Sequence, residues 1–251
     1  MKHFILNSSK QKIFIVLFWV SMWEILSLVI GQEIYLPSPY SAFNALLNLL
    51  KCKNTYITIF YSTYRTLAGF ALSCTAGILL GYLCGTNNLI HDLFNPFIST
   101  IRTIPVMSII IIAIMWFSDT NVPIFVAFLM CFPIIWTNTV AGIKSADSNL
   151  LDMCRLYKVR KSRVIFSVYL FSALPYIRAA MISALGIGWK VTSAAEVLSL
   201  PKYSIGSFLY DSKVYLEMPD LFAWTIIIII LSITFEAILK KLFKLRNYDQ
   251  S

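Results

Sequence analysis

Long apolar runs are the feature that most constrains what this chain can fold into. From Ile13 onward they recur along the sequence, and they approach the roughly 17–25 residues that a helix needs to cross the hydrocarbon core of a bilayer. Hydrophobic residues make up 58% of the 251 residues and charged residues only 13%, whereas a soluble domain carries about 25% charged residues. The sequence therefore predicts an all-α, polytopic membrane protein.

Six segments fit transmembrane helices. The first follows Lys10 and Lys12 as a signal peptide would, but it is longer than a signal sequence and no A-x-A-like cleavage site follows it, so we expect it to be retained. The six predicted spans are residues 13–30, 62–85, 97–117, 122–141, 168–198 and 220–240. Residues 1–12 and 241–251 are then tails, residues 31–61 form an external segment, and residues 62–240 hold the core with the other five spans.

The positive charge is concentrated in three places. Lys and Arg gather in the N-terminal tail, in the loop at about residues 144–163 and in the C-terminal "KKLFKLR", and the net charge is +9. Because basic segments flanking spans are retained in the cytoplasm, this pattern places both termini and the 144–163 loop there. The basicity thus reports orientation in a cell (inner) membrane and not a nucleic-acid partner. Residues 201–219 are too short and too charged to span, so we expect them at the outer interface.

No motif for catalysis or metal binding is present in the sequence. It has no G-x-x-x-x-G-K-[ST] loop and no G-x-S-x-G motif. His3 and His91 have no neighbouring ligands at metal spacing. The five cysteines are scattered singly and are interpreted as small packing residues. We therefore expect a chain that is not an enzyme and that has no metal or cofactor of its own.

Small residues recur every four positions in the second predicted span. They are Gly69, Ser73, Gly77, Gly81 and Gly85, and this spacing stacks them along one helix face. Small residues let two helices approach closely inside a membrane. The stripe predicts a tight helix–helix seam rather than a ligand site.

The loop between the fourth and fifth spans contains a short apolar helix. Asn149 is expected to cap it, with Asp152 at its third position near the positive end of the helix dipole. Two turns this apolar are marginally stable alone in water, so the helix must bury itself against the inner membrane surface, its own bundle or a cytoplasmic partner. Its apolar face comprises Leu150, Met153, Cys154 and Tyr157, with Leu151 and Leu156 on the flanks and Arg155 polar.

This loop resembles the cytoplasmic coupling loop of type I ATP-binding-cassette (ABC) importer permeases. That loop reads E-A-A-x-x-x-G, then a nonpolar stretch and L-P; here it reads "DMCRLYK…VYLFSALP". Asp152 replaces the Glu, Met153 and Cys154 replace the two alanines, Lys158 replaces the Gly, and Leu170-Phe171 replaces Leu-Pro. The stretches "STYRTLAGFALSCTAGILLGYLCG", "IRTIPVMSIIIIAIMWF", "FPIIWTNTVAGIKSAD", "ALGIGWKVTSAAEVLS" and "IGSFLYDSKVYLEMPDLFAWT" resemble the subgroup that takes up nitrate, sulfonates, taurine or vitamin precursors.

The resemblance implies an assembly with several partners. Two permease copies, identical or paralogous, would form the pathway; two cytoplasmic ATPase subunits would carry ATP and Mg; and an external binding protein would deliver a small polar or anionic solute. Residues 150–158 would dock on the ATPase. Because Lys158 cannot take the left-handed backbone of Gly without some cost, the turn after the helix is expected to differ. The basic run from Lys158 to Arg163 would face either an acidic rim of the ATPase or membrane lipids.

Two ionisable residues lie deep in the fifth predicted span. Lys190 and Glu196 are six positions apart and so do not share a helix face. In one interpretation they line the pathway, with Lys190 favouring an anionic substrate and Glu196 gating or pairing with it. In the other, Lys190 snorkels or pairs with another span, and Glu196 reaches the outer interface near Pro201.

Prolines interrupt the third and fourth predicted spans. Pro105 and Pro133 remove backbone donors, so kinks are expected there, serving either as hinges or only for packing; Pro105 is counted with the pathway. The favoured interpretation is an importer permease. The rival is an ATP-independent channel or ion-driven carrier whose basic loop merely binds lipid.

Overall fold

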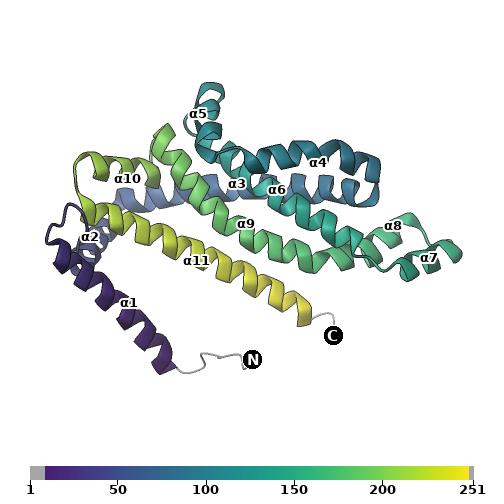
Figure 1. The fold of residues 1–251 in the computed structure, drawn as a ribbon, viewed down its shortest axis with the longest axis horizontal. Helices are drawn as coiled ribbons and strands as arrows, with labels where there is room; N and C mark the ends of the chain where they lie inside the picture. Colours follow the sequence, from purple (N-terminus) through teal and green to yellow (C-terminus); the bar gives the residue numbers. More distant parts are fainter. Residues whose placement is uncertain (1–8, 249–251) are drawn as a thin grey trace. The chain divides into compact units, whose positions relative to one another are not determined.

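The computed structural model describes residues 9–248, and residues 1–8 and 249–251 of the two predicted tails lie outside the described range. Within residues 9–248 every regular element is a helix (Figure 1), which confirms the all-α prediction. The helices are α1 (Ser9–Ile30), α2 (Pro39–Lys51), α3 (Lys53–Thr86), α4 (Asn88–Thr103), α5 (Val106–Trp116), α6 (Val122–Lys144), α7 (Ser148–Leu156), α8 (Lys161–Val164), the π-helix η1 (Ile165–Tyr169), α9 (Leu170–Ser199), α10 (Ile205–Val214) and α11 (Met218–Tyr248).

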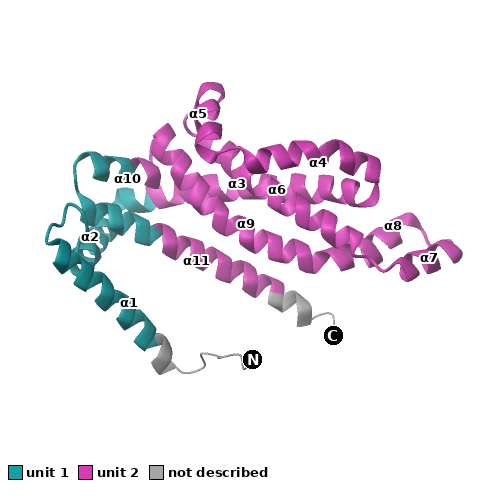
Figure 2. Cartoon of the chain, in the orientation of Figure 1, with its two compact units in different colours: residues 1–57, 208–227 teal, residues 58–207, 228–251 magenta. Residues whose placement is uncertain are grey.

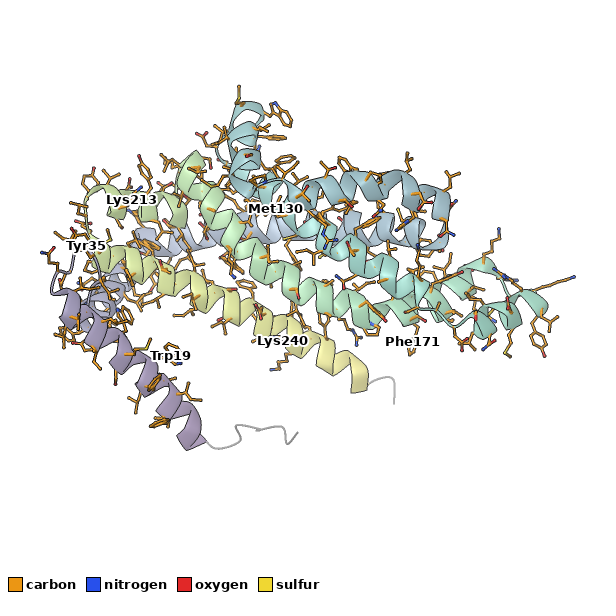
Figure 3. All side chains as sticks on the ribbon, in the orientation of Figure 1. Trp19, Tyr35, Met130, Phe171, Lys213 and Lys240 are labelled. Atoms are coloured by element: carbon orange, nitrogen blue, oxygen red, sulfur yellow. The ribbon has the colours of Figure 1, made fainter. Side chains whose placement is uncertain are left out.

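The chain forms two compact units, coloured separately in Figure 2. The first comprises residues 1–57 and 208–227. In it, Trp23 Nε1 donates a hydrogen bond to the Pro37 carbonyl oxygen at 3.0 Å, and the Trp23 ring stacks on Phe222 at 5.7 Å. Only 6% of residues 13–30 are buried within the chain. Side chains such as Trp19 stand out along α1 (Figure 3), as expected of a helix that faces lipid.

Within residues 9–248, five helices are long and apolar enough to cross a membrane, and α4 with α5 makes a sixth only if this bent pair is one span. Four of the predicted spans are recovered with longer bounds. The second begins at Lys53 instead of residue 62, because α3 extends into the predicted external segment 31–61. The fifth is continuous from Lys161 through α8, η1 and α9 to Ser199. The structure thus confirms a polytopic helical protein and moves the boundaries.

The predicted third span, residues 97–117, is divided between two helices, α4 and α5. The axes of α4 and α5 differ by 101°, a turn visible where α5 leaves α4 in Figure 1. The break falls at Ile104, which is extended (φ −67°, ψ 131°), directly before Pro105. A residue that precedes proline is disfavoured in the helical region, and proline itself donates no backbone hydrogen bond. The expected kink at Pro105 is therefore a complete break.

The second unit, residues 58–207 and 228–251, is built around α6. Half of the apolar stretch of α6 is buried, the highest share among the five candidate spans. It crosses α9 closely, since a Cβ added at Gly142 would lie 2.7 Å from Ala173 Cα. Cys131 Sγ donates to the Ala184 carbonyl oxygen at 3.1 Å. Cys131 and Cys84 are fully buried in apolar clusters, which agrees with their interpretation as packing residues.

The small-residue stripe of α3 lies against α6. A Cβ added at Gly69 would come within 2.6 Å of the Ile124 carbonyl oxygen, and one at Gly81 within 2.7 Å of Thr139 Cβ. Ser73 Oγ donates to the Phe128 carbonyl oxygen at 3.0 Å. Gly77 and Gly85 meet Ile135 and Ile143 at 2.9 and 2.6 Å in the same way. All five residues of the stripe therefore form one contact surface with a single helix.

Candidate functional site

The first candidate site is α7, which projects from the second unit beyond the end of α9 (Figure 1). Its N-cap is Asp147, whose side chain accepts a hydrogen bond from the backbone N–H of Asn149 at 2.8 Å. The expectation that Asn149 caps the helix is wrong, because Asn149 is already inside the first helical turn. Asp152 instead forms an exposed ion pair with Arg155 at 3.1 Å. Asp147 supplies the negative charge at the positive end of the helix dipole.

The apolar surface of α7 is divided between the chain and its surroundings. Leu151 and Cys154 are half-buried against the chain. The opposite side is exposed, and none of the residues of α7 is buried, so the helix does not fold back into its own bundle. The exposed apolar side chains are Leu150 (49%), Met153 (53%), Leu156 (77%) and, at the C-cap, Tyr157 (73%).

The turn after α7 keeps the left-handed geometry that was expected to change. Lys158 has φ +47°. Its N–H donates to the Arg155 carbonyl oxygen at 3.1 Å, and the Val159 N–H donates to the Cys154 carbonyl oxygen at 2.9 Å. This pair of bonds is the Schellman motif, in which glycine is the usual residue at the left-handed position. These two hydrogen bonds satisfy two terminal carbonyl groups of α7. They hold Lys158 in a left-handed backbone conformation that is strained for a lysine.

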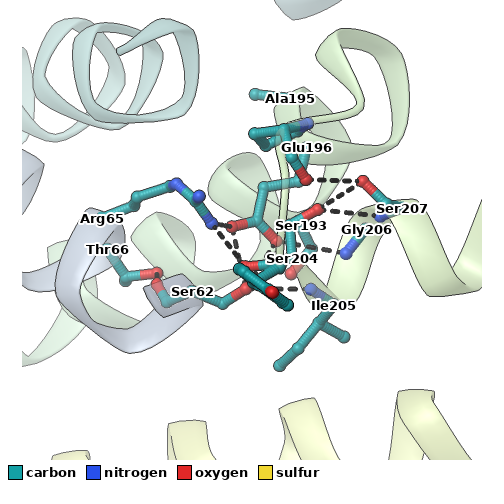
Figure 4. Close-up of polar contacts among 12 residues, drawn as sticks. Ser62, Arg65, Thr66, Ser193, Ala195, Glu196, Ser204, Ile205, Gly206 and Ser207 are labelled. Carbon is teal, nitrogen blue, oxygen red and sulfur yellow. Dashed lines mark hydrogen bonds and ion pairs between the residues drawn. The ribbon is translucent and has the colours of Figure 1, made fainter. Parts of the chain in front are cut away.

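The second candidate site is a buried ion pair between α3 and α9, shown in Figure 4. Arg65 Nη1 lies 3.0 Å from Glu196 Oε1, and both side chains are almost fully buried. Ser62 Oγ lies 2.8 Å from each carboxylate oxygen, and the Gly206 N–H donates to Glu196 Oε2 at 3.1 Å. The carboxylate therefore has donors from α3, from α10 and from a guanidinium.

The same network fixes the turn between α9 and α10. Arg65 Nη2 donates to the Lys202 carbonyl oxygen at 3.0 Å, and Nη1 donates to the Tyr203 carbonyl oxygen at 3.1 Å. Ser62 Oγ accepts from the Ile205 N–H at 2.9 Å. A Cβ added at Gly206 would lie only 2.3 Å from Glu196 Cβ, so only glycine lets α10 approach α9 this closely.

The structure shows neither the pairing of Glu196 with Lys190 nor an exposed Glu196 at the interface. The residue is fully buried rather than at the outer interface, and its partner is Arg65 rather than Lys190. The side chain of Lys190 is exposed and has no hydrogen-bond or ion-pair partner among the described residues. Sequence analysis missed Arg65. The available signal was an arginine inside the second predicted span, since a charge there needs a partner.

Pro105 lies beside a cavity of about 250 Å³ where α4 and α5 meet α6 and α9. Arg102 supplies the only charged side chain of its wall, and Pro133 lines it as well. Ile187 and Val191 of α9 also line it, whereas Lys190, the neighbour of Val191, does not. The structure therefore places Arg102, and neither Lys190 nor Glu196, in the wall of the cavity beside the Pro105 bend.

The two candidate sites lie far apart along one helix. Glu196 is close to the C-terminal end of α9, whereas α7 precedes the N-terminal start of the same continuous helix at Lys161. At 1.5 Å per residue the separation along the axis is roughly 50 Å. No cluster of potential metal ligands occurs among the described residues.

Comparisons with known proteins agree with this architecture. Residues 77–245 match the model of the family described as "binding-protein-dependent transport system inner membrane component". The nitrate import permease protein NrtB of Synechococcus elongatus is 28% identical over 205 residues, covering 77% of this chain and 73% of that protein. The putative aliphatic sulfonates transport permease protein SsuC of Bacillus subtilis is 26% identical over 235 residues, covering 91% and 84%.

Solved structures show the same fold. The crystal structure of an amino acid ABC transporter with histidines matches with a TM-score of 0.59, covering 81% of this chain and 98% of that chain at 17% identity. The relatives are transport permeases and not enzymes. With its apolar spans and a family match over most of its length, the chain belongs to the binding-protein-dependent transport system inner membrane components, the multi-pass permease subunits of ABC importers.

Proposed function

We propose that this permease subunit forms the membrane pathway for a small anion and that α7 couples the pathway to a cytoplasmic ATPase. The substrate class is supported by relatives whose names refer to nitrate, aliphatic sulfonates and, for the CmpB protein of Synechococcus elongatus (29% identical over 152 residues), bicarbonate. Each of these substrates carries negative charge on oxygen atoms. An exposed cation such as Lys190 would favour such a solute.

The observation that carries the coupling role is the uncovered apolar side of α7. Leu156 and Tyr157 are 77% and 73% exposed, although they lie in a short helix that is marginal alone in water. Burying two such side chains in a groove of a partner contributes roughly 1.5–3 kcal/mol each. A cytoplasmic protein that receives this side is the partner that the family implies, an ATP-hydrolysing subunit carrying Mg and ATP.

The local structure makes α7 suitable for transmitting force. Its N-terminus is capped by Asp147 immediately after α6, and its C-terminus is closed by the Schellman turn at Lys158. The chain then enters the continuous helix that starts at Lys161. Movement of the ATPase would therefore reach α6 and α9 together. The external binding protein would release its anion at the opposite membrane face, between two permease copies.

The docking test is a double substitution on the exposed side of α7. Met153→Asp with Leu156→Asp should release the ATPase from the detergent-solubilised complex, because two charges would have to enter the partner's apolar groove. The control is Ser148→Asp, which adds a charge at an exposed residue of α7 that is five and eight positions from Met153 and Leu156 and so lies off their helix face. Membrane insertion should be unchanged in both variants. Full retention of the ATPase by the double variant would contradict the coupling role.

The transport test is uptake by the reconstituted complex. Proteoliposomes that hold this chain and its ATPase, supplied with the binding protein, should accumulate nitrate, an alkylsulfonate or bicarbonate only when ATP is present on the ATPase side. Uptake by the chain alone without ATP would support the rival carrier. Uptake of a cation or a neutral solute in preference to all three anions would contradict the proposed substrate class.

A further inference from the structure

The structure contains a cavity of about 700 Å³ under α7 that the proposed coupling role does not use. Three cations line it, Arg155, Lys158 and Lys161, and no carboxylate does. Two tyrosines, Tyr82 and Tyr169, also line it and contact each other edge to face at 6.4 Å. The polar wall thus combines positive charges with hydroxyl donors, the groups that bind phosphate oxygens.

The other wall of this cavity is apolar. It includes Leu151 on the half-buried side of α7 and Val164 and Ile165 at the start of the long fifth span. Part of it is the π-helix η1 (Ile165–Tyr169), a widened turn of a kind found often at functional sites. A ligand that fits both walls carries a charged phosphate group next to hydrocarbon.

The cavity also lies at a membrane boundary. Tyr82 and Thr86 come from the last turn of α3, and Lys161 to Tyr169 come from the first turns of the span 161–199. Two candidate spans therefore end at the same place, which is the level of lipid headgroups for a membrane-embedded chain. Clusters of basic residues next to span ends attract anionic phospholipids.

We propose that this cavity binds the phosphate headgroup of an anionic phospholipid. Arg155, Lys158 and Lys161 contact the phosphate, the tyrosine hydroxyls donate to its oxygens, and the acyl chains leave along Val164 and Ile165 toward the bilayer. The lipid then braces α7 against the ends of α3 and α9. This site uses the half-buried side of α7, whereas ATPase docking uses the exposed side, so the two proposals succeed or fail separately.

The basic run offers a matched pair of variants for the test. Lys158→Gln with Lys161→Gln removes two charges from the cavity wall. Arg160→Gln with Arg163→Gln removes two charges from the same segment, at exposed residues that do not line the cavity. Both double variants lower the net charge by two, so a difference between them reports the cavity and not the general attraction of the loop for lipid.

The measurement is retention of lipid by the full chain in mild detergent, followed by native mass spectrometry during titration with phosphatidylglycerol or phosphatidylcholine. The native protein and R160Q/R163Q should each keep one phosphatidylglycerol, while K158Q/K161Q should bind it roughly twenty- to thirtyfold more weakly. Phosphatidylcholine should bind weakly throughout. Equal loss in both double variants, equal retention of phosphatidylcholine, or displacement by equimolar inorganic phosphate would overturn the proposal.

Discussion

At the scale of single residues, Glu196 illustrates how a membrane protein keeps a charge in its interior. Removing two ions from water costs several kcal/mol each, and the bond at 3.0 Å to Arg65 offsets this only together with further donors. Ser62 and Gly206 supply those donors. Arg65 in turn closes the turn between α9 and α10 by donating to the carbonyl groups of Lys202 and Tyr203. The ion pair therefore specifies how α3, α9 and α10 meet.

Removing either partner of this ion pair should destabilise the protein strongly. Glu196→Ala and Arg65→Ala each leave one charge buried without its partner, which costs about 3–5 kcal/mol. The double variant removes both charges and should lose less than the sum of the two single variants. Unfolding by SDS titration from mild detergent micelles measures all three free energies. Additive losses would show that the two residues do not interact.

At Lys158, which has a left-handed backbone, we predict that a substitution stabilises the protein instead of destabilising it. Lys158→Gly should stabilise the end of α7 by roughly 0.5–1 kcal/mol, because relief of backbone strain exceeds the added flexibility of glycine. Lys158→Ala, which has a Cβ as lysine does, should give no such gain. Hydrogen exchange of the Val159 N–H, which donates to the Cys154 carbonyl oxygen, measures the effect. Faster exchange in the glycine variant would contradict it.

At the scale of elements, the seam between α3 and α6 depends on the absence of side chains. Lipid provides no hydrophobic drive between helices, so close packing must supply the attraction. The contacts of Gly69 with the Ile124 carbonyl oxygen and of Gly81 with Thr139 leave no room for a methyl group. The seam can therefore form only where glycine or serine repeats at the spacing of one helix face.

Two glycines of the same unit respond differently to alanine. Gly69→Ala should destabilise the protein by about 1–3 kcal/mol through overpacking, because its Cβ would lie 2.6 Å from a backbone oxygen. Gly188→Ala is the control: its Cβ would meet Cys131 Sγ at 3.4 Å, an ordinary contact, and alanine favours a helix by up to about 1 kcal/mol. SDS unfolding compares the two. Equal destabilisation by both substitutions would refute the seam as the cause.

At the scale of the whole molecule, much of the surface of both units is apolar. Phe171 on α9, labelled in Figure 3, is 61% exposed, and Ile229 and Ile233 on α11 are 51% and 63% exposed. Exposed apolar surface of this extent needs lipid or another subunit around it. An exposed cation within a span is an exception on such a surface, and Lys190 is one.

Replacing Lys190 tests the anion pathway in the assembled transporter. Lys190→Met should lower ATP-driven anion uptake at least tenfold while leaving the complex intact, because an apolar side chain provides no attraction for a dehydrated anion. Lys190→Arg keeps the charge and should retain most uptake. The assay is uptake of labelled anion by proteoliposomes at matched protein content. Unchanged uptake by the methionine variant would remove Lys190 from the pathway.

The sequence alone was sufficient for the membrane class, the helical fold, the α3 stripe and the apolar helix at 148–156, since each of these depends on periodicity and composition within one segment. The prediction for the turn at Lys158 was wrong. The cost of a left-handed backbone at lysine can be judged from the sequence, but whether the hydrogen bonds of the turn outweigh that cost cannot. The cap was placed two residues late for a similar reason: Asp147 and Asn149 are both good caps, and only the path of the chain from α6 selects between them.

Only the tertiary structure decided the partner of Glu196. Arg65 lies 131 positions away in the sequence, and no local pattern links an arginine in one span to a glutamate in another. The break between α4 and α5 likewise needed the packing of α5 against α6 and α9, because proline permits a range of kinks. The spacing of apolar and small residues is a property of a single helix, so the sequence of that helix is enough to recognise it. The pairing of buried charges and the direction of a broken span depend on which helices meet, and that is fixed only when the chain has folded.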